Sequence, residues 1–395
     1  MNGNLRNDIL KSLAWLLEGN RSRIIEANRL DIAACSPDDA VILDRLKVND
    51  AKVDSMIASV NSVINSPDPV GQVISSRTRA NGLRIENRRV PFGTILIIYE
   101  ARPDVSIEAA IIALKAGNRI LLKGGKEARN TNLFLAGLWR QALTENNADA
   151  DTVRYLDISR EETQELICGN SEKFDLVIPR GGEALIEFVV KNSNAPVIVS
   201  GRGNNFLYID LEADFEMALA IALDGKRRLS VCNALDKILI HAALPDIEAK
   251  TARLVDGLRM TNIEIYGDHA VCGLDASVLL VADENIWFEE FLSAKIVIGL
   301  VENSAAAIDK INKYAGGHSA SIVTKNVETA ERFMNEVDCA AVYHNASVRF
   351  TDGGEFGLGA EIAISTQKLH FRGPLGAEHL VTNKWFVLGS GQTRD

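Results

Sequence analysis

Residues 93–123, GTILIIYEARPDVSIEAAIIALKAGNRILLK, contain the clearest structural signal of the chain. The apolar runs 93–99 and 119–123 have the length and composition of strands that are buried on both faces, and a helical stretch from Pro103 to Lys115 separates them. A buried strand, a helix and a second buried strand form the unit from which parallel sheets are built. The stretch therefore predicts an α/β fold.

The alternation of strands and helices continues on the C-terminal side of this stretch. The next apolar runs lie at 155–158, 175–178 and 196–199. The helix after the first of them begins with the capping box Ser159–Glu162. We interpret this part as one doubly wound α/β domain. From residue 230 a second series follows, and it predicts a second α/β domain with strands at 237–241, 263–266, 295–301, 319–324 and 340–346.

The two ends of the chain differ from these domains. Residues 1–65 have helical periodicity and predict a helical lead-in. Residues 70–89 contain short β-prone pieces around Asn81-Gly82, a dipeptide typical of a tight hairpin turn. The last thirty residues, from about Ser365, include a short β-prone run but are too few to form a core. We expect this tail to pair elsewhere, for instance on a neighbouring subunit.

Length and composition exclude several classes of protein. The 395 residues predict two or three domains, and the 47% of apolar residues is typical of a soluble globular protein. A formal net charge of −10 without a dense run of Lys and Arg argues against a nucleic-acid partner. No apolar stretch has the length of a membrane span, and the amphipathic N-terminus does not resemble a signal peptide. We therefore expect a cytoplasmic protein.

The cysteines indicate neither a disulfide framework nor a metal site, because the five of them are widely spaced without a CxxC pair. Cys232 differs from the others, since it follows Lys226, Arg227 and Arg228 and precedes an apolar strand. Nearby positive charge stabilises a thiolate, which is the nucleophilic form of cysteine. The alternative is a buried, inert cysteine, which is the interpretation we give to the other four.

Two predicted strands end in a glycine pair that is followed by a helix. The residues of these two turns are Lys123, Gly124, Gly125, Arg180, Gly181 and Gly182. Backbone amides at a helix N-terminus bind phosphate, and open α/β sheets bind ligands at the carboxyl ends of their strands. The two turns therefore favour a dinucleotide site. A strand-to-helix turn also needs glycine for geometric reasons, however, and neither turn matches the GxGxxG pattern.

Polar residues at the end of the run 93–99 are further candidates. Glu100, Arg102 and Asp104 follow the strand directly, and an arginine there suits an anionic substrate. A capped helix start explains Pro103 and Asp104 equally well, but it does not explain Arg102. Residues 344–368 are rich in Gly, Ser, Thr and Asn, which is typical of a functional loop and also of a long turn.

Taken together, these segments resemble the γ-glutamyl phosphate reductase family, a branch of the aldehyde dehydrogenase superfamily, from about Leu5 to Gly391. The most specific pieces are VPFGTILIIYEARPDVSIEAA, ALKAGNRILLKGGKEA, SVCNAL, NKYAGGHSASIVT and VRFTDGGEFGLGAEIAISTQKLHFRGP. The resemblance implies an aldehyde-dehydrogenase-like fold with two doubly wound α/β domains and a small β oligomerisation element. Its implied parts are an NADPH-binding domain (1–69 and 93–228), a catalytic domain (229–364) and an oligomerisation hairpin and tail (70–92 and 365–395).

The resemblance also implies a reaction. It is the NADPH-dependent reduction of L-glutamyl 5-phosphate to L-glutamate 5-semialdehyde and phosphate, the second step of proline biosynthesis. Cys232 would be the nucleophile that forms a thioester, and Arg102 would stabilise the thioester oxyanion. Partners implied beyond the substrate are further copies of the chain, in a dimer or tetramer, and glutamate kinase.

Binding residues follow from the same resemblance. Lys123 would contact the adenosine ribose and the 2′-phosphate of NADPH, together with Gly124 and Gly125. Arg180, Gly181 and Gly182 would lie near the pyrophosphate, and Glu289 with Phe291 would hold the nicotinamide ribose. The substrate would contact Glu100, Asn345, Arg349, Thr351 and Asp352.

The chain departs from the family pattern at three positions close to the expected site. Val199 stands where family members have a glutamate, which in aldehyde-oxidising relatives activates water. Leu229 replaces a proline, and Arg202 is unusual in its loop. The loss of the glutamate argues against the first rival function, an NAD-dependent oxidative aldehyde dehydrogenase. A second rival is a non-catalytic relative that binds glutamate kinase.

Overall fold

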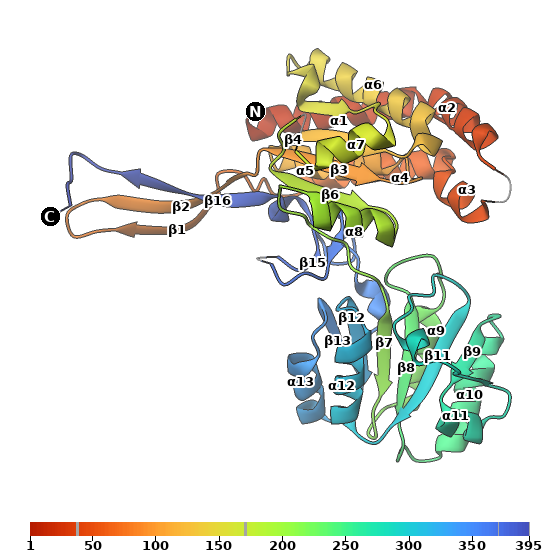
Figure 1. Cartoon of the computed structure of the whole chain (residues 1–395). Helices are drawn as coiled ribbons and strands as arrows, with labels where there is room; N and C mark the ends of the chain where they lie inside the picture. The colour runs from red at the N-terminus through yellow and green to blue at the C-terminus, as the bar shows by residue number, and fades with distance from the viewer. Residues whose placement is uncertain (37–38, 170–171, 370, 395) are drawn as a thin grey trace. The chain divides into compact units, whose positions relative to one another are not determined.

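The computed structural model describes residues 1–36, 39–169, 172–369 and 371–394. The chain forms two compact units (Figure 1). Unit 1 contains Met1–Val199, Gly357–Ala363 and Leu375–Asp395. Unit 2 contains Ser200–Phe356 and Ile364–Pro374.

Unit 1 is built on a parallel four-stranded sheet with the order β5-β4-β3-β6. Its strands are β3 (Thr94–Tyr99), β4 (Arg119–Gly124), β5 (Val153–Tyr155) and β6 (Leu176–Arg180). The connecting helices are α5 (Val105–Lys115), α6 (Arg129–Glu145), α7 (Arg160–Ile167) and α8 (Glu183–Asn192). The helix α7 begins with the predicted capping box of Ser159 and Glu162. The sequence prediction of a parallel α/β domain is confirmed.

Both faces of this sheet are covered. Leu96 and Ile98 of β3 pack in one cluster with Leu166 of α7 and Val189 of α8, while the neighbouring Ile97 is also completely buried. Because successive strand residues point to opposite faces, a strand buried on both faces needs a continuous apolar run.

The helical lead-in of unit 1 forms α1 (Gly3–Gly19), α2 (Arg21–Ala34), α3 (Ala40–Leu46) and α4 (Asp50–Asn65). The buried carboxylate of Asp31 fixes α2 to the start of α6, since it accepts hydrogen bonds from the backbone N–H groups of Asn130 (2.9 Å) and Thr131 (2.8 Å). It thereby satisfies two of the N–H groups that a helix leaves unpaired in its first turn.

Unit 2 contains a parallel seven-stranded sheet with the order β10-β9-β11-β8-β7-β12-β13. Its strands are β7 (Asn205–Ile209), β8 (Leu235–His241), β9 (Glu264–Gly267), β10 (Leu279–Leu280), β11 (Lys295–Val301), β12 (Ser319–Val323) and β13 (Ala341–His344). Its helices are α9 (Phe215–Gly225), α10 (Ile247–Arg259), α11 (His269–Leu274), α12 (Ser304–Tyr314) and α13 (Val327–Glu336).

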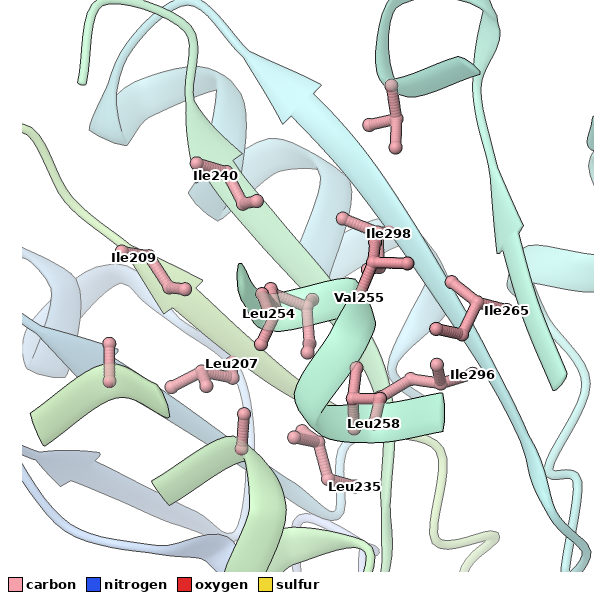
Figure 2. Close-up of a cluster of buried hydrophobic side chains, with 14 of the residues drawn as sticks. Leu207, Ile209, Leu235, Ile240, Leu254, Val255, Leu258, Ile265, Ile296 and Ile298 are labelled. Atoms are coloured by element: carbon pink, nitrogen blue, oxygen red, sulfur yellow. The ribbon is translucent and has the colours of Figure 1, made fainter. Parts of the chain in front are cut away.

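The two faces of the second sheet bury alternate residues of each strand. Leu207 of β7 and Ile298 of β11 lie in the cluster under α10, which Figure 2 shows with Leu254 and Leu258 of that helix. Phe206 and Val297, their neighbours in sequence, lie in a second cluster with residues of α12 and α13. Unit 2 is therefore doubly wound as well.

The hairpin and the tail form a three-stranded antiparallel sheet, which we call the arm (Figure 1). Its strands are β1 (Val73–Thr78), β2 (Arg84–Pro91) and β16 (Val381–Leu388). The predicted turn is present, and Gly82 has a φ of +83°, which glycine adopts without strain. The tail strand pairs with β2 of the same chain. Two short strands, β14 (Ile364–Ser365) and β15 (Gly373–Pro374), precede it in unit 2.

Four sequence predictions need correction. The predicted domain boundary at 228/229 lies at 199/200, because β7 hydrogen-bonds to β8 and β12 of the second sheet. The tail divides between the units at 374/375. The run 196–199 forms a single bridge from Val197 to Val177 and no strand, and the strand predicted at 155–158 ends at Tyr155. Local sequence shows that a segment is β-prone, but the sheet that it joins depends on long-range packing.

Two searches of the described residues gave negative results. No helix among them has the length and the apolar character that a bilayer crossing requires. No group of three or more His, Cys, Asp or Glu side chains in the same part of the chain is arranged to hold a metal ion.

Candidate active site

Cys232 lies, partly buried, on the loop 226–234 between α9 and β8, which we call the cysteine loop. The amide nitrogen of Asn205, at the start of β7, lies 2.7 Å from the carbonyl oxygens of Cys232 and Ala234 and 2.8 Å from that of Gly203. Asn205 is completely buried, so its amide replaces water as the donor to these carbonyl groups. One side chain thus fixes the backbone at Cys232 and at Ala234.

Gly203 touches the same loop. A Cβ atom at position 203 would lie 1.6 Å from the carbonyl oxygen of Cys232, so the backbone there leaves no room for any side chain. The N–H group of Gly203 donates to the carboxylate of Glu290 at 2.9 Å. The start of β7 and the glycine two residues before it therefore both contact the cysteine loop, and neither is close to Cys232 in sequence.

A third anchor joins the cysteine loop to the predicted substrate loop. The side-chain amide of Asn233 donates to the carbonyl groups of Arg349 and Thr351, both at 3.0 Å. The residue next to Cys232 thus holds residues 349–351 in place. The structure brings together two sequence segments that were singled out separately.

A cavity of about 420 Å³ opens in unit 2 at these two segments, lined by Asp224, Arg227, Arg228, Arg349, Phe350 and Glu355. Three guanidinium groups against two carboxylates give the cavity a net positive lining, which suits an anionic ligand. The Nη1 atom of Arg349 is buried and has no hydrogen-bond partner among the described residues. It is a donor without an acceptor, and an anion in the cavity would supply one.

The other predicted substrate residues are engaged within the protein. The hydroxyl of Thr351 is buried and lies 2.7 Å from the hydroxyls of Ser319 and Tyr343. The amide of Asn345 makes both of its hydrogen bonds to the backbone of Thr324. The carboxylate of Asp352 accepts from the N–H of Gly354 at 2.8 Å. Of the four candidates in this loop, Arg349 is the one that lines the cavity.

The predicted cofactor residues of unit 1 lie at the carboxyl edge of its sheet, which we call the strand edge. Tyr99 is in register with Gly124 on one side and Arg180 on the other. The chain runs from β3 outward through β4 to β5 and then crosses to β6 on the other side of β3. The strand order reverses between β3 and β6, and open α/β sheets bind ligands at such switch points.

Two carboxylates hold the backbone at this edge. Glu100 accepts from the N–H of Gly182, the N-cap of α8, at 2.7 Å. Glu127 accepts from the N–H of Ala101 at 2.8 Å, and Ala101 has a φ of +36°, an uncommon value for a residue with a side chain. Glu100, which we expected to contact the substrate, therefore occupies the helix N-terminus that we expected to bind the pyrophosphate. Arg102 is exposed.

The turn after β4 carries Lys123, which is half-buried. Its Nζ donates to the carbonyl of Gly124 at 2.6 Å, and burial lowers the pKa of its ammonium group, although Glu127 and Asp157 partly oppose that change. The lysine side chain is thus held at the predicted glycine turn, where the negative charge of a phosphate group would favour its charged form.

An acidic pair, a buried Asp104 and a half-buried Glu108, was missed in the sequence. Asp104, which sequence analysis interpreted as a helix cap, makes no capping hydrogen bond and forms an ion pair with Lys52 of α4. Burial raises the pKa of Glu108, one turn further along α5, to about 7, and the negative charge of Asp104 adds to this effect. The spacing of four positions between Asp104 and Glu108 is the one feature of the sequence from which their proximity could have been predicted.

Glu289 and Phe291, the predicted contacts of the nicotinamide ribose, follow the 3-10 helix Glu284–Trp287 of unit 2. Glu289 is exposed, whereas Phe291 is 8% exposed and packs in the cluster with α12 and α13. Its ring lies against the ammonium group of Lys237, with 3.8 Å between Nζ and the ring centroid. The buried lysine was not predicted, because position 237 was interpreted as part of an apolar strand.

Fold and site together define an α/β enzyme scaffold of the aldehyde dehydrogenase class. The sequence model of the aldehyde dehydrogenase family matches residues 1–265 and 277–359. An acetylating aldehyde dehydrogenase from Geobacillus thermoglucosidasius superimposes with a TM-score of 0.71 at 16% identity, over 100% of this chain and 94% of its own, which shows the shared fold.

Relatives with higher sequence identity to this chain share one name. The γ-glutamyl phosphate reductase of Dictyoglomus turgidum is 42% identical over 401 residues, which cover 100% of this chain and 95% of the relative. The crystal structure of γ-glutamyl phosphate reductase from Thermotoga maritima superimposes with a TM-score of 0.95 at 40% identity, over 100% of this chain and 95% of its own. The chain belongs to the γ-glutamyl phosphate reductase family.

Proposed function

We propose that the protein reduces L-glutamyl 5-phosphate to L-glutamate 5-semialdehyde with NADPH, the second step of proline biosynthesis. The observation that carries the proposal is the fixed loop of Cys232 beside a cavity lined by three arginines. A loop that carries a thiol nucleophile and also contributes two arginines to a positively charged cavity suits an acyl phosphate. The names of the relatives point to the same reaction.

The chemistry proceeds in two steps on Cys232. The thiol of Cys232 first gives up its proton, and the thiolate attacks the acyl carbon of the substrate. The bond from that carbon to the phosphate oxygen breaks, and phosphate leaves. A hydride then adds to the carbonyl carbon of the thioester. The carbon–sulfur bond breaks, the aldehyde leaves, and the thiolate takes up a proton. Two moderate steps replace one difficult displacement.

NADPH supplies the hydride when it is bound. The residues that fit it in unit 1 are the N-terminus of α8 at Gly182, where a carboxylate already accepts from the N–H group, and the turn at Gly124 and Gly125. A carboxylate on this N–H group marks a site that accepts an anion. The half-buried Lys123 suits the 2′-phosphate that distinguishes NADPH from NADH.

The cavity matches the charges of the substrate. Its phosphate and α-carboxylate are anions that Arg227, Arg228 and Arg349 would bind, and its α-ammonium group would pair with Asp224 or Glu355. Family resemblance assigns Arg102 as the donor to the oxyanion, an interaction that contributes a few kcal/mol of transition-state stabilisation in other enzymes.

The arm is the proposed oligomerisation element. Trp385 and Val387 of β16 and Val73 and Ile74 of β1 are exposed apolar side chains on its strands. Exposed apolar strands tend to be covered by a partner, and here a second copy of the chain would cover them. Size-exclusion chromatography with light scattering would test this, since a Trp385→Lys variant should shift the mass toward that of the monomer.

The reverse reaction tests the proposed function. Purified protein receives glutamate 5-semialdehyde, NADP and inorganic phosphate, and the absorbance of the reduced cofactor is followed. We expect reduction that depends on phosphate, because the thioester must be released by phosphorolysis. Cys232→Ala should abolish turnover and keep NADPH binding, whereas Cys339→Ala, which changes a buried thiol elsewhere in unit 2, should keep activity.

Two outcomes would contradict the proposal. Turnover without phosphate would indicate an oxidative aldehyde dehydrogenase. A folded protein that binds the cofactor but shows no turnover would indicate a different substrate or a non-catalytic role.

A further inference from the structure

Three consecutive residues of unit 2, Glu289, Glu290 and Phe291, are each held by a polar contact from another element. The ammonium group of Lys237 donates to the carbonyl of Glu289 at 2.8 Å. The N–H of Gly203 donates to the carboxylate of Glu290 at 2.9 Å. The N–H of Phe291 donates to the carboxylate of Asp236 at 2.9 Å. Segment 289–291, outside any strand or helix, is thus fixed residue by residue.

Lys237 is the unusual member of this set because it is completely buried. Its ammonium group has the ring of Phe291 on one side and the carbonyl of Glu289 as its acceptor. Burial lowers the pKa of Lys237 to about 7, and Lys226 contributes to that decrease, while Asp236, Glu289 and Glu290 oppose it. A lysine in such a position is costly, so its contacts with segment 289–291 need an explanation beyond filling space.

The same set of charges also borders the cysteine loop. Lys226 begins the loop and pairs with Asp236 at 2.7 Å, and both side chains are buried. Asp236 and Lys237 follow the loop in β8. Gly203, the donor to Glu290, is packed against the carbonyl of Cys232. Gly203 therefore contacts both segment 289–291 and the cysteine loop, and Asp236 and Lys237 lie in the strand that follows that loop directly.

We propose that Lys237 is a positioning residue, which holds segment 289–291 in the conformation that binds the nicotinamide end of the dinucleotide. The proposal rests on the proposed function, since the role of Glu289 and Phe291 comes from the family resemblance. Lys237 lies beneath the ring of Phe291 and acts through the segment. Loss of its hydrogen bond frees the carbonyl of Glu289 and loosens the side chain that would bind the ribose.

Lys310 offers a matched control within unit 2. Its ammonium group lies 3.6 Å from the ring centroid of Trp287, and burial lowers the pKa of Lys310 as well. Lys310, which is half-buried, thus repeats the contact between a lysine ammonium group and an aromatic ring. Among the described residues, it donates no hydrogen bond to segment 289–291.

The experiment compares Lys237→Met, Lys237→Gln and Lys310→Met in the full-length protein. NADPH binding is measured by its fluorescence, and the KM values for NADP and phosphate are measured in the reverse reaction. Lys237→Met should raise the Kd for NADPH and the KM for NADP about tenfold, the effect of one lost hydrogen bond from a charged donor. The KM for phosphate should change less than twofold. Lys237→Gln, which keeps a donor without a charge, should stay within about threefold of the wild type, and Lys310→Met should match the wild type.

Several results would overturn the inference. One is a folded Lys237→Met variant with unchanged NADPH binding, and another is an equal loss in Lys310→Met. If circular dichroism shows that Lys237→Met does not fold, the Lys237→Gln variant tests the inference instead. This variant keeps a hydrogen-bond donor, so a folded Lys237→Gln protein that binds NADPH tenfold more weakly would contradict a role of the hydrogen bond. The binding measurement needs no turnover, so it still tests Lys237 if the proposed reductase activity is absent.

Discussion

Side chains hold the cysteine loop of unit 2 by its backbone carbonyl groups, whereas they hold the strand edge of unit 1 by its backbone N–H groups. In the cysteine loop, the side-chain amides of Asn205 and Asn233 donate to backbone carbonyl groups. At the strand edge, the carboxylates of Glu100 and Glu127 accept from backbone N–H groups. Both arrangements fix an irregular backbone, but they leave different groups for a ligand.

The difference determines what each region loses when a ligand or a mutation displaces an anchor. A buried carbonyl group that loses its amide donor has no replacement, so the loop itself is destabilised. An N–H group at a helix N-terminus that loses a carboxylate can donate its hydrogen bond to a phosphate group instead. We therefore expect the conformation of the cysteine loop to depend on its anchors. At the strand edge, the carboxylate of Glu100 occupies a site that an anionic ligand can take.

The largest expected effect is that of Gly203→Ala. The new methyl group would lie 1.6 Å from the carbonyl oxygen of Cys232, so either β7 or the cysteine loop must move. Misplacement of a nucleophile by about 1 Å costs roughly a hundredfold in rate, and we expect at least that loss in the reverse reaction. Gly257→Ala in α10, where the new methyl group meets side chains at 3.4 Å or more, is the control and should keep the wild-type rate. A fully active Gly203→Ala variant would show that the loop is not rigid.

Asn205→Ala should lower the stability of unit 2. Buried carbonyl groups would lose their donor, at a cost of about 1–3 kcal/mol for each group that remains unsatisfied. Thermal unfolding followed by circular dichroism should show a lower midpoint. Asn194→Ala removes a comparable bond to the carbonyl of Cys168, but at an exposed site where water replaces it, and it should change the midpoint little. Equal effects of the two substitutions would contradict the difference that we draw between buried and replaceable anchors.

The titratable groups of Glu108 and Lys237 should give stability opposite dependences on pH. Burial raises the pKa of Glu108 from an ordinary 4.5 to about 7, so the folded state binds more protons between those values and stability falls as the pH rises from 4.5 to 7. Burial lowers the pKa of Lys237 from 10.5 to about 7, so the unfolded state binds more protons and stability rises from pH 7 to 10.5. Each slope is at most about 1.4 kcal/mol per pH unit.

Urea unfolding of the wild type, Glu108→Gln and Lys237→Met across this pH range checks both signs. The Gln variant should lack the decrease below pH 7, and the Met variant should lack the increase above it. An unchanged slope in either variant would mean that water reaches the group in the folded protein.

The smallest expected effect is that of Glu100→Gln. The substitution removes a negative charge from the N-terminus of α8, so NADPH should bind about two- to fivefold more tightly in a fluorescence titration. Glu187→Gln, further along α8, removes the same charge away from the N-terminus and should leave binding unchanged. A higher KM for glutamate 5-semialdehyde in Glu100→Gln would instead support the original prediction that Glu100 contacts the substrate.

The elements predicted with most success are those whose signal is local. The run 295–301 is a strand with the predicted bounds, and the capping box at Ser159 begins a helix as expected. The run 196–199 was equally apolar, yet it forms one bridge, because no neighbouring strand continues the pairing. The assignment of β7 to the second sheet depends on its pairing with β8 and β12, which no local pattern records.

The candidate site shows the same division. Cys232 was singled out from its basic neighbours, and Arg227, Arg228 and Arg349 line one cavity, a grouping that the sequence did not predict. The anchors of the cysteine loop were not found, because Gly203 and Asn205 contact it across 29 and 27 positions of the chain. Asparagine and glycine occur in many loops, so their identity alone indicates no contact.

The amino-acid order was sufficient for the α/β class, the arm hairpin and the choice of one cysteine, because hydrophobic periodicity, turn geometry and local charge act over a few neighbouring residues. Only the folded chain determined which sheet each strand joins, which carbonyl groups the buried amides reach, and how burial brings Glu108 and Lys237 to a pKa of about 7. Burial and pairing depend on residues distant in sequence, since a side chain loses its water only when remote segments close over it.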